Sequence, residues 1–290
     1  MSAAPRRSFS VPLPGRAPLV LGPRTLVMGV INVTPDSFSD GGLALNPERA
    51  ADLAVAMEEA GVDIIDIGAE STRPGATPVG TADELARVRP VLRAVSGRVT
   101  VPISIDTYKS EVAGLALSEG ASIINDISGL QYDPRLGSLA AARGAPIVLM
   151  HTRGRPQDMY AHAEYGDAVG EVATDLQAAV ARAKSAGISN DCILLDPGLG
   201  FAKHAAQSLA VLAGLERLAV LGYPLLVGPS RKSFMTPVTG PLSPEARDWP
   251  TAAAVTAAIL AGAHIVRVHR VAEMVTVARV ADAIRDASGV

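Results

Sequence analysis

The sequence predicts an α/β protein built as one (β/α)8 barrel, a TIM barrel, with a short N-terminal hairpin in front of it. Three observations support this prediction. Short apolar runs alternate with helical segments eight times, the apolar runs do not alternate polar with apolar residues, and 290 residues suffice for one barrel. A doubly wound open sheet is the alternative, but no Gly-x-Gly-x-x-Gly follows the first strand and the chain has no P-loop.

The chain before the barrel is rich in proline and arginine. Residues 1–15 are therefore expected to form a flexible leader, and residues 16–290 the single domain. The hairpin is expected to pair residues 19–21 with residues 26–28 around the turn formers Gly22 and Pro23.

The eight expected strands are apolar runs bounded by turn residues, at 26–32, 63–68, 101–106, 122–125, 146–150, 192–196, 224–227 and 265–268. Each precedes a helical segment, at 47–60, 81–96, 109–119, 134–143, a stretch ending near 186, 207–221, a stretch from about 251, and 271–287. Asn46 and Pro47 supply an N-cap and a first helical residue. Thr81 and Glu84 have the spacing of a capping box.

Composition restricts the partners of the protein. The 26 basic and 29 acidic residues nearly balance, which argues against nucleic acid or an anionic membrane surface. The single cysteine, Cys192, lies in an apolar run and cannot form an internal disulfide, so a buried thiol in a reducing cytoplasm is expected. No signal-peptide core is found, and the most apolar helix, 252–261, is too short to span a membrane.

Polar residues stand at the carboxyl ends of nearly all expected strands, where such barrels carry their active sites. They are Asn32, 70–73, Asp106, Asn125, Met150, His151, Asp196, 230–232 and 267–269. Any one of them could be an ordinary helix cap, but their accumulation at one end predicts a site in the barrel mouth. The histidines lack the spacing of a zinc site.

One group in this set suits a flat heterocycle. Asp106, Asn125 and Asp196 offer carboxylate and amide groups that match ring N–H, amino and carbonyl positions. A carboxylate can pair with an aminopyrimidinone edge through two charge-assisted bonds. Lys232 adds a donor for a ring nitrogen or carbonyl.

A second group is basic or hydroxylic and suits a phosphate or diphosphate. It consists of Thr72, Arg73, Arg267 and His269. Asn32 stands beside them, and its amide oxygen is a ligand that Mg²⁺ accepts when phosphates supply the negative charge. The mouth is therefore expected to bind a heterocycle that carries a diphosphate.

Eight segments in series resemble the motifs of bacterial dihydropteroate synthases, namely 28–42, 66–75, 104–107, 124–126, 149–151, 195–201, 228–233 and 267–269. The resemblance implies a transferase of folate biosynthesis that condenses 6-hydroxymethyl-7,8-dihydropterin diphosphate with 4-aminobenzoate. The products are 7,8-dihydropteroate and diphosphate. It also implies Mg²⁺, a sulfonamide target and a homodimer.

Carried over by position, the resemblance gives the residues roles. The catalytic set is Asp106, Asp196, Lys232 and Arg267. Asn125 and Met150 join these four around the pterin. The diphosphate would lie against Asn32, Thr72, Arg73, Arg267 and His269, with Mg²⁺ at Asn32. The 4-aminobenzoate pocket would be formed by Ser230, Pro74, Phe201, Lys232 and Phe38. Residues 34–42 and 71–74 would be mobile lids over that pocket.

Three positions depart from the family pattern: Ala69 replaces a usual glycine, Arg270 a common aspartate, and Trp249 lies in an altered segment before the seventh helix. Two alternatives remain open from the residues alone. A methyltetrahydrofolate-dependent methyltransferase shares the pterin grip but needs no diphosphate site. An inactive paralogue would keep the barrel without the reaction.

Overall fold

The structure is a computed structural model that describes residues 6–33, 46–73 and 75–287. Eight parallel strands form its centre, in the order β8-β7-β6-β5-β4-β3-β10-β9. The strands are β3 Leu26–Asn32, β4 Ile64–Gly68, β5 Ile103–Asp106, β6 Ile123–Asp126, β7 Ile147–Met150, β8 Ile193–Asp196, β9 Leu226–Val227 and β10 Ile265–Val268. A bridge between Leu195 and Leu225 joins β8 to the start of β9 and closes the ring. The (β/α)8 barrel is confirmed.

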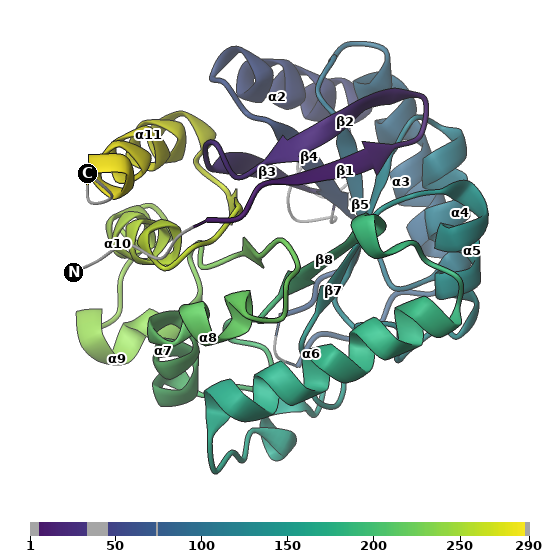
Figure 1. Ribbon diagram of the computed structural model, residues 1–290. Helices are drawn as coiled ribbons and strands as arrows, with labels where there is room; N and C mark the ends of the chain where they lie inside the picture. The colour runs from purple at the N-terminus through teal and green to yellow at the C-terminus, as the bar shows by residue number, and fades with distance from the viewer. Residues whose placement is uncertain (1–5, 34–45, 74, 288–290) are drawn as a thin grey trace.

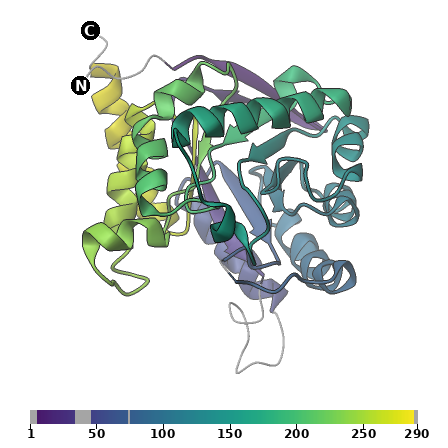
Figure 2. The ribbon, with the colours of Figure 1, turned by 90° about the horizontal axis from the view of Figure 1, so that it is seen from below.

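Helices pack around this ring, as Figures 1 and 2 show. They are α2 Pro47–Glu59, α3 Thr81–Ser96, α4 Ser110–Ser118, α5 Arg135–Arg143, α6 Ala168–Ser185, α7 Ala205–Ala213, α8 Leu215–Ala219, α9 Thr236–Thr239, α10 Asp248–Leu260 and α11 Val271–Ala287. The chain also has 3-10 turns at Met159–His162, Asn190–Cys192 and Ser233–Met235. Among the described helices none is long and apolar enough to cross a bilayer.

The core has two parts because each strand buries both faces. The larger part fills the space between strands and helices. The smaller part lies within the base of the barrel, where strand residues such as Met28, Ile64 and Leu194 meet Val11 and Leu21 of the hairpin. The hairpin therefore closes the amino-terminal end of the barrel, the end it crosses in Figure 1.

The hairpin differs from the prediction. β1 (Phe9–Leu13) pairs antiparallel with β2 (Arg16–Leu21), so residues 26–28 are free to enter the barrel as part of β3. The flexible leader expected at 1–15 is wrong for residues 6–15, and residues 1–5 lie outside the described part. The physical reason is that Val11 and Leu13 alternate with the more accessible Ser10 and Pro12 and bury their side chains in the base.

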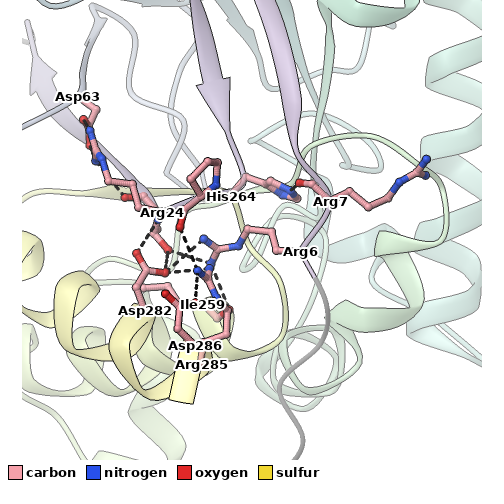
Figure 3. A network of polar contacts seen from close by, with 11 residues as sticks. Arg6, Arg7, Arg24, Asp63, Ile259, His264, Asp282, Arg285 and Asp286 are labelled. Carbon is pink, nitrogen blue, oxygen red and sulfur yellow. Dashed lines mark hydrogen bonds and ion pairs between the residues drawn. The ribbon is translucent and has the colours of Figure 1, made fainter. Parts of the chain in front are cut away.

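Polar contacts anchor the segment before β1 to the last helix, as Figure 3 shows. Asp282 of α11 accepts hydrogen bonds from the backbone N–H of Thr25 (2.6 Å) and from its hydroxyl (2.8 Å). The Arg6 guanidinium lies 3.3 Å and the Arg285 guanidinium 3.0 Å from the same carboxylate. We refer to Arg6, Thr25, Asp282 and Arg285 as the base network.

Two helix predictions resolve differently. The N-cap at Asn46 is confirmed, since its side chain accepts bonds from the N–H groups of Glu48 and Arg49. The capping box at Thr81 is wrong: Gly80 is the N-cap of α3 and caps with no side chain. The Glu84 carboxylate instead points inward and accepts a bond from the Thr107 hydroxyl (2.8 Å).

Candidate active site

Strand register brings the predicted polar residues together at the carboxyl ends of the strands. Asp106 of β5 lies opposite Gly68 of β4 and Asn125 of β6, and Met150 of β7 lies opposite Asp196 of β8. A Cβ atom at Gly68 would lie 3.1 Å from the Asp106 Cβ, so the glycine makes room for that carboxylate. The predicted convergence in the barrel mouth follows directly from this register.

Arg267 of β10 lies at the centre of the mouth. Its Nε donates to Asp66 Oδ2 at 2.6 Å, and its Nη2 donates to Asp106 Oδ2 at 2.7 Å. Burial opposes the charge of this guanidinium, but the two carboxylates outweigh it and raise the pKa of Arg267. Burial raises the pKa of Asp106, and Arg267 counteracts that rise.

Asp66 was missed by the sequence analysis. It is fully buried in β4, and Oδ2 also accepts a bond from the Asn125 amide at 3.0 Å. Its other oxygen, Oδ1, has no partner in the described structure. A lone aspartate inside the apolar run Ile64–Gly68 was the available signal, because an unpaired buried carboxylate is costly and needs a cation.

The second half of the mouth holds Asp196 and Lys232. Asp196 is buried, and its Oδ1 accepts a bond from the Gly198 N–H at 2.7 Å. Burial lowers the pKa of Lys232 to about 8, while Asp196 opposes that shift. The Lys232 ammonium donates to the Leu199 carbonyl at 2.6 Å and lies 4.5 Å from the centre of the Phe201 ring. This arrangement places an ammonium, a carboxylate and an aromatic face around one space.

Ser230 and His269 form a third element of the site. The Ser230 hydroxyl oxygen accepts from the backbone N–H of His269 (3.2 Å) and lies 2.9 Å from His269 Nδ1. With Nδ1 accepting the hydroxyl proton, the neutral imidazole carries its own proton on Nε2. Burial, helped by Arg267, lowers the pKa of His269 to about 4. These surroundings favour the neutral form of the His269 imidazole.

The remaining predicted residues either lie at or just after the carboxyl ends of strands or fall outside the residues that the structure describes. Asn32 ends β3 half-buried, and Met150 is buried at the end of β7. Thr72 and Arg73 follow β4, and the Gly75 N–H donates to the Pro156 carbonyl (2.9 Å) across the rim. Phe38 and Pro74 fall among the residues that are not described, as do residues 34–42 of the expected lid.

Lys109 anchors the segment that leads to Thr72. Its ammonium pairs with both Glu70 and Glu84, and the Tyr108 hydroxyl donates to Glu70 at 2.9 Å. One cation thus binds two carboxylates that are almost inaccessible to solvent. The sequence analysis placed Glu70 at a strand end without finding this partner.

The three departures from the family pattern lie in ordinary surroundings. Ala69 is fully buried, and its carbonyl accepts a bond from Arg87 at 3.1 Å. Arg270 pairs with Glu273 and lies 3.8 Å from Asp248, so two carboxylates offset its charge. Trp249 is 82% exposed at the start of α10 and does not pack over the neighbouring loop.

Arg231 and Asp248, two charged residues next to the mouth, pair with each other and so fix the loop that contains Arg231. The Arg231 guanidinium forms a two-bond ion pair with Asp248 (2.8 and 2.9 Å), and its backbone adopts a positive φ of 58°.

In the described residues no group of three or more histidine, cysteine, aspartate or glutamate side chains is arranged to hold a metal ion.

Comparison with known proteins agrees with the chemistry of this mouth. The family described as pterin binding enzyme matches residues 28–269. A dihydropteroate synthase of Synechocystis is 47% identical over 277 residues, covering 95% of this chain and 96% of its own. The Xanthomonas albilineans dihydropteroate synthase with 4-aminobenzoic acid has a TM-score of 0.87 and 41% identity, covering 95% of this chain and 99% of its own. The same enzyme with 7,8-dihydropteroate has a TM-score of 0.83 and 38% identity, covering 94% and 99%.

The chain therefore belongs to the pterin-binding enzyme family and, within it, to the dihydropteroate synthases. It is an enzyme of folate biosynthesis that transfers a pterin-methyl group to 4-aminobenzoate and forms 7,8-dihydropteroate. The methyltransferase alternative is set aside, since the relatives compared above are named dihydropteroate synthases.

Proposed function

We propose that Asp106, Asn125, Asp196 and Lys232 hold the pterin diphosphate, with the Arg267 guanidinium against the ring. The observation that supports this most strongly is the convergence on Arg267 of two carboxylates, one of which also holds the Asn125 amide. A buried carboxylate at Asp196 and a half-buried one at Asp106 suit a ring that carries several N–H donors.

The chemistry needs no protein nucleophile. The bond between the pterin methylene carbon and the diphosphate oxygen breaks, and its electron pair leaves with diphosphate. Asp106 and Asp196 stabilise the positive charge left on the pterin, and water screens them only partly, because Asp196 is buried and the Asp106 side chain is 14% exposed. The 4-aminobenzoate nitrogen then bonds to the methylene carbon and loses a proton to solvent.

The departing diphosphate is assigned to the donor side of the mouth. His269 offers Nε2–H, and Arg267 keeps Nη1 beyond the two atoms that bind its carboxylates. Arg73 lies near enough to His269 to lower the pKa of that imidazole. Thr72 completes the group with a hydroxyl.

Mg²⁺ remains a proposal, and Asn32 is the residue proposed to hold it. A single neutral oxygen ligand fits an ion whose other ligands are diphosphate oxygens and water. When bound, the ion would offset charge on the diphosphate. Chelation of divalent ions should abolish turnover, and Asn32→Ala should raise the Mg²⁺ concentration needed for half-maximal turnover. An equal requirement in both proteins would remove Asn32 from this role.

The 4-aminobenzoate pocket is proposed next to Lys232. The Phe201 ring and the Ser230 hydroxyl supply an aromatic face and a polar group, and the resemblance adds Phe38 and Pro74. Sulfonamides carry an aniline and an acidic group in similar positions, so they should compete with 4-aminobenzoate. Inhibition that 4-aminobenzoate does not relieve would contradict the shared pocket.

We also propose a homodimer through the outer face of α10 and α11. Val280 (56% exposed), Ile284 (50%) and Trp249 (82%) leave apolar surface in water on these helices. Small residues between the two helices, Ala252, Ala253 and Thr256, would let an identical helix pair approach closely. Val280→Glu should give monomers in sedimentation velocity, whereas Val220→Glu, at an exposed position on another face, should not. If both variants stay dimeric, or if the wild-type protein is a monomer, this face is not a dimer interface.

A cytoplasmic location stays part of the proposal. Its support is the lone cysteine, Cys192, which is buried and has no disulfide partner available in the sequence.

The decisive experiment mixes the purified chain with both substrates and Mg²⁺ and separates the products by chromatography. We expect 7,8-dihydropteroate and diphosphate in equal amounts. Binding of both substrates without product would identify an inactive paralogue. Methyl transfer from a methyltetrahydrofolate would instead identify a methyltetrahydrofolate-dependent methyltransferase.

A further inference from the structure

The loop that follows β8 has a backbone fixed almost entirely by side chains. Residues 198–202 carry five successive carbonyl groups, and each accepts a hydrogen bond from a lysine or a tyrosine. The donors are Lys203 to Gly198 (3.1 Å), Lys232 to Leu199 (2.6 Å), Tyr160 to Gly200 (3.5 Å), Lys203 to Phe201 (3.0 Å) and Tyr165 to Ala202 (2.8 Å).

This loop needs such support because its backbone is strained. Gly198, Gly200 and Ala202 all have positive φ, at 64°, 77° and 47°. Only the glycines adopt that region without cost, so Ala202 must be held there. A Cβ atom at Gly198 would lie 2.0 Å from the His151 carbonyl oxygen, which shows how closely the loop packs on the end of β7.

Lys203 contributes most to this support, because it binds two of the five carbonyl groups. Its side chain is 1% exposed, and the ammonium has three acceptors: His151 Nδ1 at 2.6 Å and two loop carbonyls. Three acceptors use all three of its protons. These three bonds fix the His151 ring, the Gly198 carbonyl and the Phe201 carbonyl relative to one another, and so hold the loop against the end of β7.

The contact continues away from the loop through His151. Its Nε2 lies 3.0 Å from Asp175 Oδ2 on α6, so Nε2 carries the proton and Nδ1 is the acceptor that Lys203 needs. Arg153 holds Asp175 in turn, with Nε at 3.0 Å. Burial, followed by the charge of Lys203, lowers the pKa of His151 to about 4, which keeps the acceptor unprotonated. Burial lowers the pKa of Lys203; the carboxylates of Asp196 and Asp175 oppose that shift, and the charges of Lys232 and Arg153 add to it.

We propose that Lys203 is a positioning residue for the condensation: with His151 and Asp175 it fixes loop 197–203 and so orients Asp196, Lys232 and Phe201. The inference rests on the proposed roles of those three residues. The link is short, since Asp196 accepts from the Gly198 N–H, Lys232 donates to Leu199, and Phe201 is itself a loop residue.

The test compares Lys203→Met, which keeps most of the stem and removes the ammonium, with Lys184→Met on the exposed face of α6 as the matched control. For Lys203→Met we expect kcat to fall at least 10-fold and the KM for 4-aminobenzoate to rise several-fold. Lys184→Met should match the wild type. If Lys203→Met melts well above the assay temperature and keeps kcat and both KM values within twofold, the proposal is wrong.

A spectroscopic readout separates positioning from simple packing. In ¹⁵N spectra of labelled imidazoles, His151 should show a protonated Nε2 and a bare Nδ1 from pH 5 to 8. In Lys203→Met its pKa should rise, because the neighbouring cation is gone. An unchanged His151 titration would overturn the contact on which the proposal depends.

Asp175→Asn serves where Lys203→Met does not fold, since Asp175 is 41% exposed and its replacement is expected to be tolerated. It should lower kcat two- to fivefold and alter the His151 signal; wild-type values for both would overturn the proposal. Inactive wild-type protein would instead overturn the proposed function, whereas the His151 spectrum would still report on the contact.

Discussion

Arginine–carboxylate contacts lie at both ends of this barrel, and the two sets are built differently. In the base network, Asp282 accepts two bonds from Thr25 and lies within 3.3 Å of two guanidinium groups (Figure 3). In the mouth, Arg267 alone faces both Asp66 and Asp106. The base has a cation for each carboxylate, since Asp286 binds Arg285 as well. The mouth has more carboxylate than cation before Lys232 is counted.

This difference indicates what each end is for. A carboxylate saturated by donors gains nothing from a ligand, and its removal leaves cations unpaired in a buried place. A buried carboxylate with too few donors costs stability in the free protein and binds strongly to a ligand that brings N–H groups or positive charge. Substitutions in the mouth should therefore affect turnover, and substitutions in the base should affect stability.

The largest effect is expected for Asp106→Asn or Asp196→Asn. Each change removes a negative charge that we propose to stabilise the pterin cation, so kcat should fall about 10²–10³-fold. The melting temperature should stay within a few degrees of the wild type, because both carboxylates are costly to bury. Steady-state kinetics and thermal melts on the same samples check both parts. Near-normal turnover in both variants would refute the assignment of the mouth.

Asp66→Asn should have the next largest effect on turnover, about 10²-fold. The amide cannot balance the Arg267 charge, and its single oxygen can offer Arg267 and Asn125 only weaker, neutral hydrogen bonds. Because Asp66 itself is fully buried, the KM for pterin diphosphate should rise through its two neighbours and not through lost contact. Unchanged kinetics would mean that Arg267 keeps its place without this carboxylate.

The sequence predicted the barrel and most of the mouth because both depend on local patterns. Buried parallel strands read as apolar runs, and the polar residue that ends each run marks the mouth. Asp66 escaped notice because it sits inside such a run, where its partner is 201 residues away in sequence. Lys203 escaped because a loop lysine is normally exposed. The hairpin was misplaced because Pro12 and Pro14 hid the alternation of Val11 and Leu13.

In the base, Asp282→Asn should cost about 2–3 kcal/mol of unfolding free energy without changing kcat. It leaves the Arg6 and Arg285 guanidinium groups without their shared anion in a place where burial already lowers the pKa of Arg6 to about 10. Asp286→Asn is the matched control: its carboxylate is 62% exposed, so the loss should stay below about 1 kcal/mol. Equal stability losses in urea unfolding would show that Asp282 is no more important than a surface pair.

The smallest expected effect is the pH dependence that His264 gives the base. Its Nδ1 accepts from the Leu225 N–H (3.1 Å), and its Nε2 lies 3.0 Å from the Arg7 carbonyl, so both nitrogens suit the neutral ring. Burial lowers the pKa of His264 to about 4, and the nearby Arg6 and Arg285 charges add to this. The unfolded chain takes up the proton near pH 6.5. Stability from this contact is therefore complete above pH 6.5 and is lost as pH falls towards 4, by about 2 kcal/mol at pH 5.

His264→Gln, whose amide offers the same acceptor and donor without titrating, should flatten that part of the curve of stability against pH. His151 and His269, whose pKa values burial also lowers to about 4, remain in both proteins, so the difference between the two urea-unfolding curves isolates His264. Parallel curves from pH 7 to 5 would show that the base does not sense pH through this residue.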